Sequence, residues 1–214
     1  MDSSNIKTDK SIILNNKDMD TESNKAYIVI KRIIDFSAAL IGIILLSPIF
    51  ILTAIAIRIE SSGEIIFKQA RVGKNGKVFN IYKFRSMKID APNLSTSEFN
   101  DSHKYITKTG AIIRKTSIDE LPQLFNILKG EMSIVGPRPV IESEKDLLQL
   151  REMYKIDSIL PGVTGWAQVN GRDNLDVHEK VKYDYEYLIN KSIFLDIKII
   201  FMTIFKVLKL EDVK

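Results

Sequence analysis

The chain has 214 residues, a formal net charge of +4 and no cysteine. This length suits one domain with an additional anchoring segment, and the lack of cysteine excludes a disulfide framework, a thiol nucleophile and a cysteine-ligated zinc site. Only two histidines occur, His103 and His178, so neither a histidine-rich metal site nor a histidine-dependent serine triad is expected. The positive charge favours a partner that carries phosphates.

The N-terminal part divides into a polar tail and an apolar segment. Residues 1–24 are mixed in charge and rich in Ser, Asn, Asp and Lys, which predicts a disordered tail. Within the next segment, 25–60, residues 36–57 contain no charged side chain. As a helix they would be about 33 Å long, enough to cross a hydrocarbon core of about 30 Å. The polar lead and the apolar run are both too long for a cleaved signal peptide, so this segment is expected in a membrane.

Ser47 and Pro48 lie near the middle of the apolar segment. Proline lacks the N–H that would bond the carbonyl of Ile44, so the helix should kink or break there, and the Ser47 hydroxyl could satisfy a freed carbonyl. Basic residues flank both ends of the segment, so their distribution gives no orientation. The pattern fits both a kinked helix that crosses the membrane and a helix–break–helix hairpin that returns to the same face.

A β-hairpin is predicted after the membrane segment. Two β-prone runs, 64–71 and 77–84, are joined by a turn in which Gly73 and Asn75-Gly76 supply positive-φ positions. The hairpin is rich in basic and aromatic residues, which could form a nucleic-acid face. Directly after a membrane segment, a surface for anionic lipid or phosphate is the simpler interpretation. Strand alternation puts two of its basic residues, Lys83 and Arg85, on the same side of the second strand.

Residues 91–108 are polar without a clear period and predict a loop, after which two adjacent carboxylates, Asp119 and Glu120, precede a short helix pattern. Pro122 marks the start of that helix, because proline is tolerated only in the first turn. Asp119 would then lie at or next to the N-cap, where the helix dipole favours its ionised form. Plain N-capping is the simplest interpretation of such an aspartate.

Arg138 stands between two prolines in the sequence GPRP, residues 136–139. Each proline pushes the preceding residue into an extended conformation, so the guanidinium is presented on a stiff backbone and suits bidentate contact with a phosphate or carboxylate. Alone, the motif is equally a surface turn with a solvated arginine. Beside the acidic pair and the basic Arg114 that precedes it, the motif indicates a phosphoryl-transfer site.

The C-terminal third reads as helices around one glycine-rich turn. Helices are expected at 142–156 and 176–190, and the turn at 161–172 contains the single tryptophan and Arg172, whose chemistry suits a phosphate ligand. Residues 192–210 are almost wholly apolar on one side. Such a helix would pack on the core of a soluble protein, but next to a membrane segment we expect it to lie in the membrane interface.

Four stretches resemble the bacterial sugar transferases, the monotopic polyprenyl-phosphate phosphoglycosyl transferases: KRIIDF, SSGEIIFKQARVGKNGKVFNIYKFRSM, RKTSIDELPQLFNILKGEMSIVGPRP and PGVTGWAQVNGR. The resemblance covers roughly residues 31–203 and implies a small form with the catalytic domain only. It implies an α+β fold, mostly helical, with a re-entrant membrane helix at 25–60 broken at Ser47-Pro48, a β-hairpin, and a catalytic domain at 61–214 that ends in the interfacial helix. The catalytic domain would lie on the cytoplasmic face of the bacterial inner membrane.

The resemblance also implies a reaction and roles for individual residues. A sugar-1-phosphate would pass from a UDP-sugar to polyprenyl (undecaprenyl) phosphate, as the first membrane step of glycan assembly, with release of UMP. Asp119 would be the nucleophile and Glu120 the ligand of Mg²⁺, which is coherent because a carboxylate can attack phosphorus to give an acyl phosphate. Phosphate-binding roles would fall to Lys83, Arg85, Arg114, Arg138 and Arg172. The partners implied include the lipid bilayer but no nucleic acid; the sugar, the glycan pathway and homo-oligomer formation are left open.

Two other functions fit parts of the pattern. The first is a membrane-bound, Mg²⁺-dependent phosphohydrolase, in which an aspartyl nucleophile passes its phosphoryl group to water and no lipid acceptor is needed. The second is a non-enzymatic membrane-tethered module whose basic hairpin binds nucleic acid or anionic lipid. This module would keep its function in Asp119→Asn, lose it when Lys83 and Arg85 are neutralised, and bind with a steep inverse dependence on salt.

Overall fold

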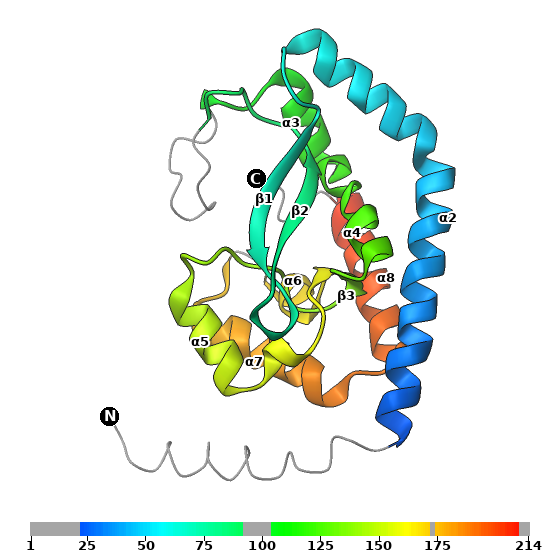
Figure 1. The fold of residues 1–214 in the computed structure, drawn as a ribbon, viewed down its shortest axis with the longest axis vertical. Coiled ribbons are helices and arrows are strands. Elements are labelled where there is room, and N and C mark those ends of the chain that lie inside the picture. Colours follow the sequence, from blue (N-terminus) through cyan, green and yellow to red (C-terminus); the bar gives the residue numbers. More distant parts are fainter. Residues whose placement is uncertain (1–21, 92–103, 172–173, 210–214) are drawn as a thin grey trace.

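The computed structural model describes residues 22–91, 104–171 and 174–209. It has the mixed, mostly helical α+β composition that was predicted, with two separate two-stranded sheets. One long helix, α2, runs along one side of the molecule, and the remaining elements lie beside it (Figure 1). In chain order the elements are α2 (Glu22–Glu60), β1 (Ile66–Val72), η2 (Lys74–Gly76), β2 (Val78–Phe84), α3 (Lys108–Lys115), η4 (Ile118–Glu120), α4 (Gln123–Lys129), β3 (Ser133–Val135), α5 (Lys145–Met153), η5 (Ile156–Ser158), β4 (Gly162–Thr164), α6 (Trp166–Asn170), α7 (Val177–Asn190) and α8 (Ile193–Lys209).

Helix α2 continues through Pro48 without a break. The hydroxyl of Ser47 donates to the carbonyl of Ile44 at 2.8 Å, which satisfies the acceptor that the proline ring leaves without its usual N–H. The two ends of α2 lie far apart in Figure 1. The structure therefore does not confirm the helix–break–helix hairpin, and the membrane topology stays a prediction. Of the predicted tail, residues 1–21 lie outside the described residues, and 22–24 belong to α2.

By length and composition, α2 is the one helix in the described part of the chain that could cross a membrane, and only 11% of its most apolar window is buried. Its inner side is anchored by polar contacts. The carboxylate of Asp35 accepts from Ser133 Oγ at 2.7 Å, and the guanidinium of Arg32 donates to the carbonyls of Ile127 and Leu128 at the end of α4. A long helix with one anchored side and an apolar outer side is typical of a helix that packs on a domain and faces lipid.

The predicted β-hairpin is confirmed, with β1 and β2 antiparallel and Phe67 paired with Lys83. The turn differs from the prediction in one position. Asn75 (φ 53°) and Gly76 (φ 72°) have the expected positive φ, whereas Gly73 has φ −112°. Lack of space, and not a positive φ, accounts for glycine at position 73, because a Cβ there would lie 3.0 Å from the ring of Phe79. The predicted loop at 91–108 lies mostly outside the described residues, and α3 already begins at Lys108.

The C-terminal helices agree with the prediction. Asp176 caps α7 and forms a reciprocal capping box with Glu179, which explains why that helix begins at Val177. Helix α8 buries Ile199 in a cluster with Val135, Val169 and Tyr187. Its other face is exposed and apolar, through Phe194, Ile197, Phe201, Ile204 and Phe205. These side chains recur at helical spacing, so α8 has one face for the core and one apolar face left without a protein partner among the described residues.

Candidate active site

Asp119 and Glu120 lie in the short 3-10 turn η4, so the prediction that Asp119 is at or next to the N-cap of the following helix is wrong. The N-cap of α4 is Pro122, and Ser117, in a left-handed conformation (φ 56°), begins a separate turn before it. Asp119 is 9% exposed, and burial raises the pKa of its carboxyl to about 6, against the opposing charge of Lys83. The helix dipole therefore does not set its protonation; burial does.

Glu120 holds two cations on one oxygen. Lys83 Nζ lies 2.7 Å and Arg138 Nη2 lies 3.2 Å from Glu120 Oε1. Lys83 comes from β2, Glu120 from η4 and Arg138 from the segment after β3, so residues far apart in the sequence meet at one point. The structure thus brings together four predicted site residues, since Asp119 also belongs to this group through its electrostatic interaction with Lys83 and Arg138.

Arg114, in the last turn of α3, approaches the same carboxylates. Its charge lowers the pKa of Asp119, although less than burial raises it. The Arg114 Nη1 atom is buried and has no hydrogen-bond partner among the described residues. A buried guanidinium N–H without a partner loses hydration without replacement, and an anionic ligand beside Asp119 would supply the missing acceptor.

The backbone around Arg138 is held through its carbonyl groups. Residues 137 and 139 are prolines and have no N–H groups, so the backbone of this segment takes part in hydrogen bonds mainly as an acceptor, through its carbonyl oxygens. Four successive carbonyls accept a hydrogen bond: Pro137 O from Gly162 N at 2.9 Å, Arg138 O from Arg151 Nη1 at 2.8 Å, Pro139 O from Arg71 Nη1 at 3.3 Å, and Val140 O from Val72 N at 2.8 Å. Arg138 is therefore fixed by a complete set of backbone contacts rather than by proline stiffness alone.

Two of these donors are arginines that sequence reasoning did not single out for the site, the half-buried Arg71 and the buried Arg151. Arg151 is held by Asp184, with Nε at 3.1 Å and Nη2 at 2.6 Å from Asp184 Oδ2. Burial, and then the charge of Arg138, lowers the pKa of Arg71 to about 10. No local sequence pattern marks Arg71 in its strand, or Arg151 and Asp184, which are 33 residues apart. Only the fold shows that the two arginines hold the backbone around Arg138.

The other predicted site residues lie elsewhere. Arg85 donates to the carbonyls of Ser61 and Ser62, which holds the end of α2 against the hairpin, and these contacts do not include the acidic pair. Its predicted role in phosphate binding stays a prediction. Arg172 lies outside the described residues. Ser47 and Pro48 lie in α2, as described above.

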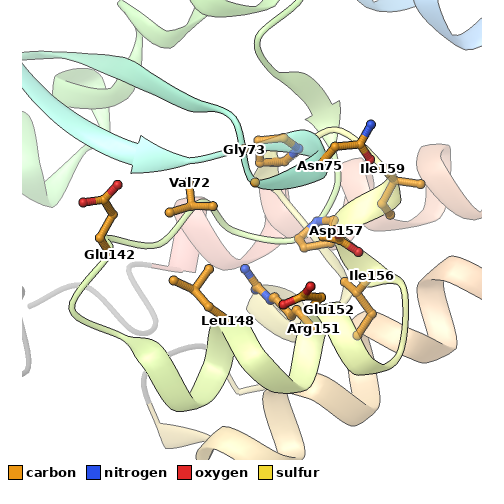
Figure 2. Close-up of a pocket in the computed structure, with 13 residues that line it drawn as sticks. Val72, Gly73, Asn75, Glu142, Leu148, Arg151, Glu152, Ile156, Asp157 and Ile159 are labelled. Atoms are coloured by element: carbon orange, nitrogen blue, oxygen red, sulfur yellow. The ribbon is translucent and has the colours of Figure 1, made fainter.

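A cavity of about 430 Å³ lies between the hairpin turn and α5, on the side of Pro137 (Figure 2). Its wall includes three carboxylates, Glu142, Glu152 and Asp157, and Figure 2 shows that they come from the segment before α5, from α5 and from η5. Neither Asp119 nor Glu120 lines it. Because an acidic wall repels phosphate groups, this cavity does not suit the diphosphate of a donor.

The acidic pair can act as a source of hard oxygen ligands. The described residues contain no group of three or more His, Cys, Asp or Glu that could enclose a metal ion. Mg²⁺ rarely needs such a cage, because it is usually held by one or two carboxylates together with substrate phosphates and water. Glu120 with its neighbour Asp119 fits that requirement, whereas zinc, which prefers His and Cys, is not favoured by these ligands.

The chain is similar to known proteins over most of its length. Residues 26–210 match the model of the family described as bacterial sugar transferase. The chain is 41% identical over 185 residues to the UDP-glucose:undecaprenyl-phosphate glucose-1-phosphate transferase of Escherichia coli K12, an alignment that covers 83% of this chain and 40% of the relative. It is 43% identical over 185 residues to a UDP-N-acetylgalactosamine-undecaprenyl-phosphate N-acetylgalactosaminephosphotransferase of Aeromonas hydrophila, covering 83% of this chain and 43% of the relative.

A third relative has nearly the same length as this chain. The uncharacterised sugar transferase EpsL of Bacillus subtilis is 40% identical over 186 residues, which covers 87% of this chain and 91% of the relative. The chain thus spans about two fifths of the two named transferases and most of EpsL. Because the family match extends over nearly all described residues, the chain belongs to the bacterial sugar transferase family.

Proposed function

We propose that the chain transfers a sugar-1-phosphate from a UDP-sugar to polyprenyl phosphate, with Asp119 as the covalent nucleophile. The observation that carries this proposal is the buried carboxylate of Asp119 next to three cationic side chains, Lys83, Arg114 and Arg138. Such a group can hold a diphosphate beside a nucleophile, because guanidinium and ammonium groups neutralise phosphate charge as a bond to phosphorus breaks. The two relatives named as sugar-phosphate transferases support the same reaction class.

The proposed chemistry has two displacements at one phosphorus atom. In the first, an Asp119 carboxylate oxygen attacks the sugar-side phosphorus of the donor, the bond from that phosphorus to the bridging oxygen breaks, and UMP leaves with that oxygen. In the second, a phosphate oxygen of the lipid attacks the same phosphorus and the Asp119 carboxylate is released. The product is a polyprenyl diphosphate sugar, and no net proton or redox partner is required.

Lys83, Arg138 and Arg114 have separate parts in this scheme. Lys83 and Arg138 hold Glu120 at 2.7 and 3.2 Å, so the carboxylate and both cations form one fixed group next to the nucleophile. Arg114 offers its buried Nη1 to a phosphate oxygen. Glu120 would be the protein ligand of Mg²⁺, which supplies charge neutralisation at the diphosphate when bound.

The contact of the site with α2 supports a proposal for its membrane position. Phe84, next to Lys83, packs edge-to-face on Phe50 of α2 with ring centroids 5.5 Å apart. The strand that carries Lys83 therefore contacts α2 near Phe50, so the placement of α2 in the bilayer also sets the depth of the basic group. We propose that α2 bends at Ser47-Pro48 in the bilayer and so enters and returns on the cytoplasmic face of the inner membrane, that the domain after residue 60 lies on that face, and that the apolar face of α8 rests in the interface.

Nucleotide release by the purified protein tests the proposal. With Mg²⁺, a panel of UDP-sugars and polyprenyl phosphate, we expect UMP from at least one donor, and the active donor names the sugar. Turnover beyond one UMP per enzyme molecule should require the lipid, and all release should require Asp119. Turnover that continues without the lipid would instead favour a phosphohydrolase, and no UMP from any donor would contradict the proposed reaction. Lys145→Gln, an exposed change on α5 away from the acidic pair, is the control variant.

A further inference from the structure

A second, smaller cavity lies between the N-terminal part of α2, the hairpin turn, η5 and the end of α7. Its volume is about 160 Å³, the space of about five water molecules at roughly 30 Å³ each. Ligand pockets for whole small molecules are usually at least about 300 Å³. A sugar nucleotide is therefore too large for this cavity, whereas a phosphate group with a few attached atoms fits.

Four basic residues line the cavity, and two of them are already engaged. Lys31 Nζ pairs with Asp196 Oδ2 at 2.8 Å, and Arg32 donates to two backbone carbonyls at the end of α4. Lys74 and Lys191 differ: neither has an ion pair or side-chain hydrogen bond within the described ranges. They come from the hairpin turn and from the residue after α7, so the fold brings two like charges to one cavity.

Lys191 is half-buried in the wall of the cavity, and Lys74 is exposed at its edge. Burial, and then the charge of Lys74, lowers the pKa of Lys191. Two ammonium groups that repel each other across a partly buried cavity are stabilised when an anion lies between them. The cavity therefore has charge complementarity to a phosphate.

The rest of the wall is mixed. It holds one carboxylate, Asp35, which lies 3.8 Å from Lys31 and stands against four basic residues, together with Ser and Tyr side chains and an apolar part that continues onto an exposed apolar surface. Ile28, Val135, Ile159 and Leu160 contribute to the wall. Ile28 is 53% exposed on α2, and Phe194, three residues after Lys191, is 81% exposed on the outer face of α8. Lysines at the border of an exposed apolar surface are typical of the region where a protein meets lipid head groups. A ligand here needs an anionic head and an apolar part.

We propose that this cavity binds the phosphate head group of an anionic phospholipid of the bilayer, with Lys74 and Lys191 as the cationic ligands and the apolar wall against the first atoms of the lipid chains. The inference rests on the membrane placement given under the proposed function, but not on the transfer reaction. The site is separate from the catalytic group. Arg32, in its wall, bonds the C-terminal end of α4, whereas Asp119 precedes the N-terminal end of that helix.

Short-chain lipids provide a direct test with the full chain in neutral detergent. The thermal midpoint is measured against dihexanoyl phosphatidylglycerol, dihexanoyl phosphatidylcholine and inorganic phosphate at one ionic strength. We expect saturable stabilisation by phosphatidylglycerol alone. The dissociation constant should rise at least tenfold in Lys74→Gln/Lys191→Gln. It should stay within twofold in Lys145→Gln/Lys182→Gln, which removes the same charge from exposed positions on α5 and α7.

Three results would overturn the proposal. Unchanged affinity in Lys74→Gln/Lys191→Gln would show that the two lysines are not ligands. Equal stabilisation by phosphatidylcholine would show binding without a charged head group, and equal stabilisation by inorganic phosphate would show a free-phosphate site instead. Without ligand, the double variant should unfold at no lower temperature than the control variant, because a like-charge repulsion is removed. If the double variant does not fold, the single variant Lys74→Gln, at an exposed position, repeats the test. The assay contains no donor or acceptor, so its failure leaves the transferase proposal standing.

Discussion

At the scale of single residues, the acidic pair divides its work. Asp119 is buried and has a raised pKa, whereas Glu120 is held by two cations. Two adjacent carboxylates thus have different environments, which is the usual way in which a protein assigns one as a reacting group and the other as a ligand. The side chains that create this difference, Lys83 and Arg138, are therefore expected to matter for catalysis more than for folding.

Arg138→Lys tests this expectation. Lysine keeps the charge but lacks the planar fork, so it cannot hold Glu120 and a phosphate oxygen with the same fixed geometry. A hydrogen bond to a charged group contributes about 1.5–3 kcal/mol, so we expect kcat/KM to fall roughly 10- to 100-fold in the UMP-release assay, with little change in the unfolding midpoint. A variant that keeps kcat/KM within about twofold of the parent would show that Arg138 acts only as a surface charge.

Sequence reasoning predicted the group of Asp119, Glu120, Lys83 and Arg138 that the fold brings together, but not the electrostatics of that group. The order Asp119, Glu120, Pro122 suggested a helix N-cap, and the structure instead has a separate turn because Ser117 takes a left-handed conformation. A non-glycine residue with positive φ leaves no periodic signal, so this turn could not be predicted. Burial of Asp119 also depends on contacts of η4 with β2, which is distant in sequence.

At the scale of elements, the segment with Arg138 is held from both sides by arginines, one half-buried and one buried. Arg71 reaches it from β1 and Arg151 from α5, and Asp184 of α7 compensates the charge of Arg151. The elements themselves were predictable, since strand and helix patterns are local. The Arg151–Asp184 pair was not, because nothing in either helix marks its partner.

Arg151→Met should unfold more easily than the parent. It leaves the buried Asp184 carboxylate without its cation and Arg138 O without its donor, and breaking a buried pair costs about 3–5 kcal/mol. Denaturant unfolding in detergent measures this loss, with Lys145→Met, an exposed change on the same helix, as the control. A loss below about 1 kcal/mol would contradict the supporting role. The free energy of unfolding of Arg151→Lys should lie between those of the parent and Arg151→Met, because lysine keeps the charge but only part of the hydrogen bonding is retained.

At the scale of the whole molecule, α2 and α8 leave apolar faces outward while their inner faces pack on the domain. The composition of the sequence was sufficient to predict both helices. The sequence does not determine whether α2 crosses the bilayer or returns to the same face, because basic residues flank both ends of the helix. The structure, in which α2 is continuous, does not confirm the return.

Single cysteines decide the topology, and the chain has no cysteine of its own. Lys25→Cys and Ser62→Cys mark the two ends of α2, and Ser192→Cys marks the domain. If α2 is re-entrant, a membrane-impermeant maleimide should leave all three unlabelled in intact cells and label all three after lysis. Labelling of position 25 in intact cells, with 62 and 192 protected, would instead show a spanning helix.

The central claim, that Asp119 carries the phosphosugar, is tested most directly by intact-protein mass spectrometry after incubation with the active UDP-sugar and no lipid acceptor. The account predicts a mass increase equal to one sugar phosphate, a modified peptide that maps to Asp119, loss of the adduct when polyprenyl phosphate is added, and no adduct in Asp119→Asn. An adduct that persists in Asp119→Asn, or transfer to the lipid by Asp119→Asn at the parental rate, would contradict it.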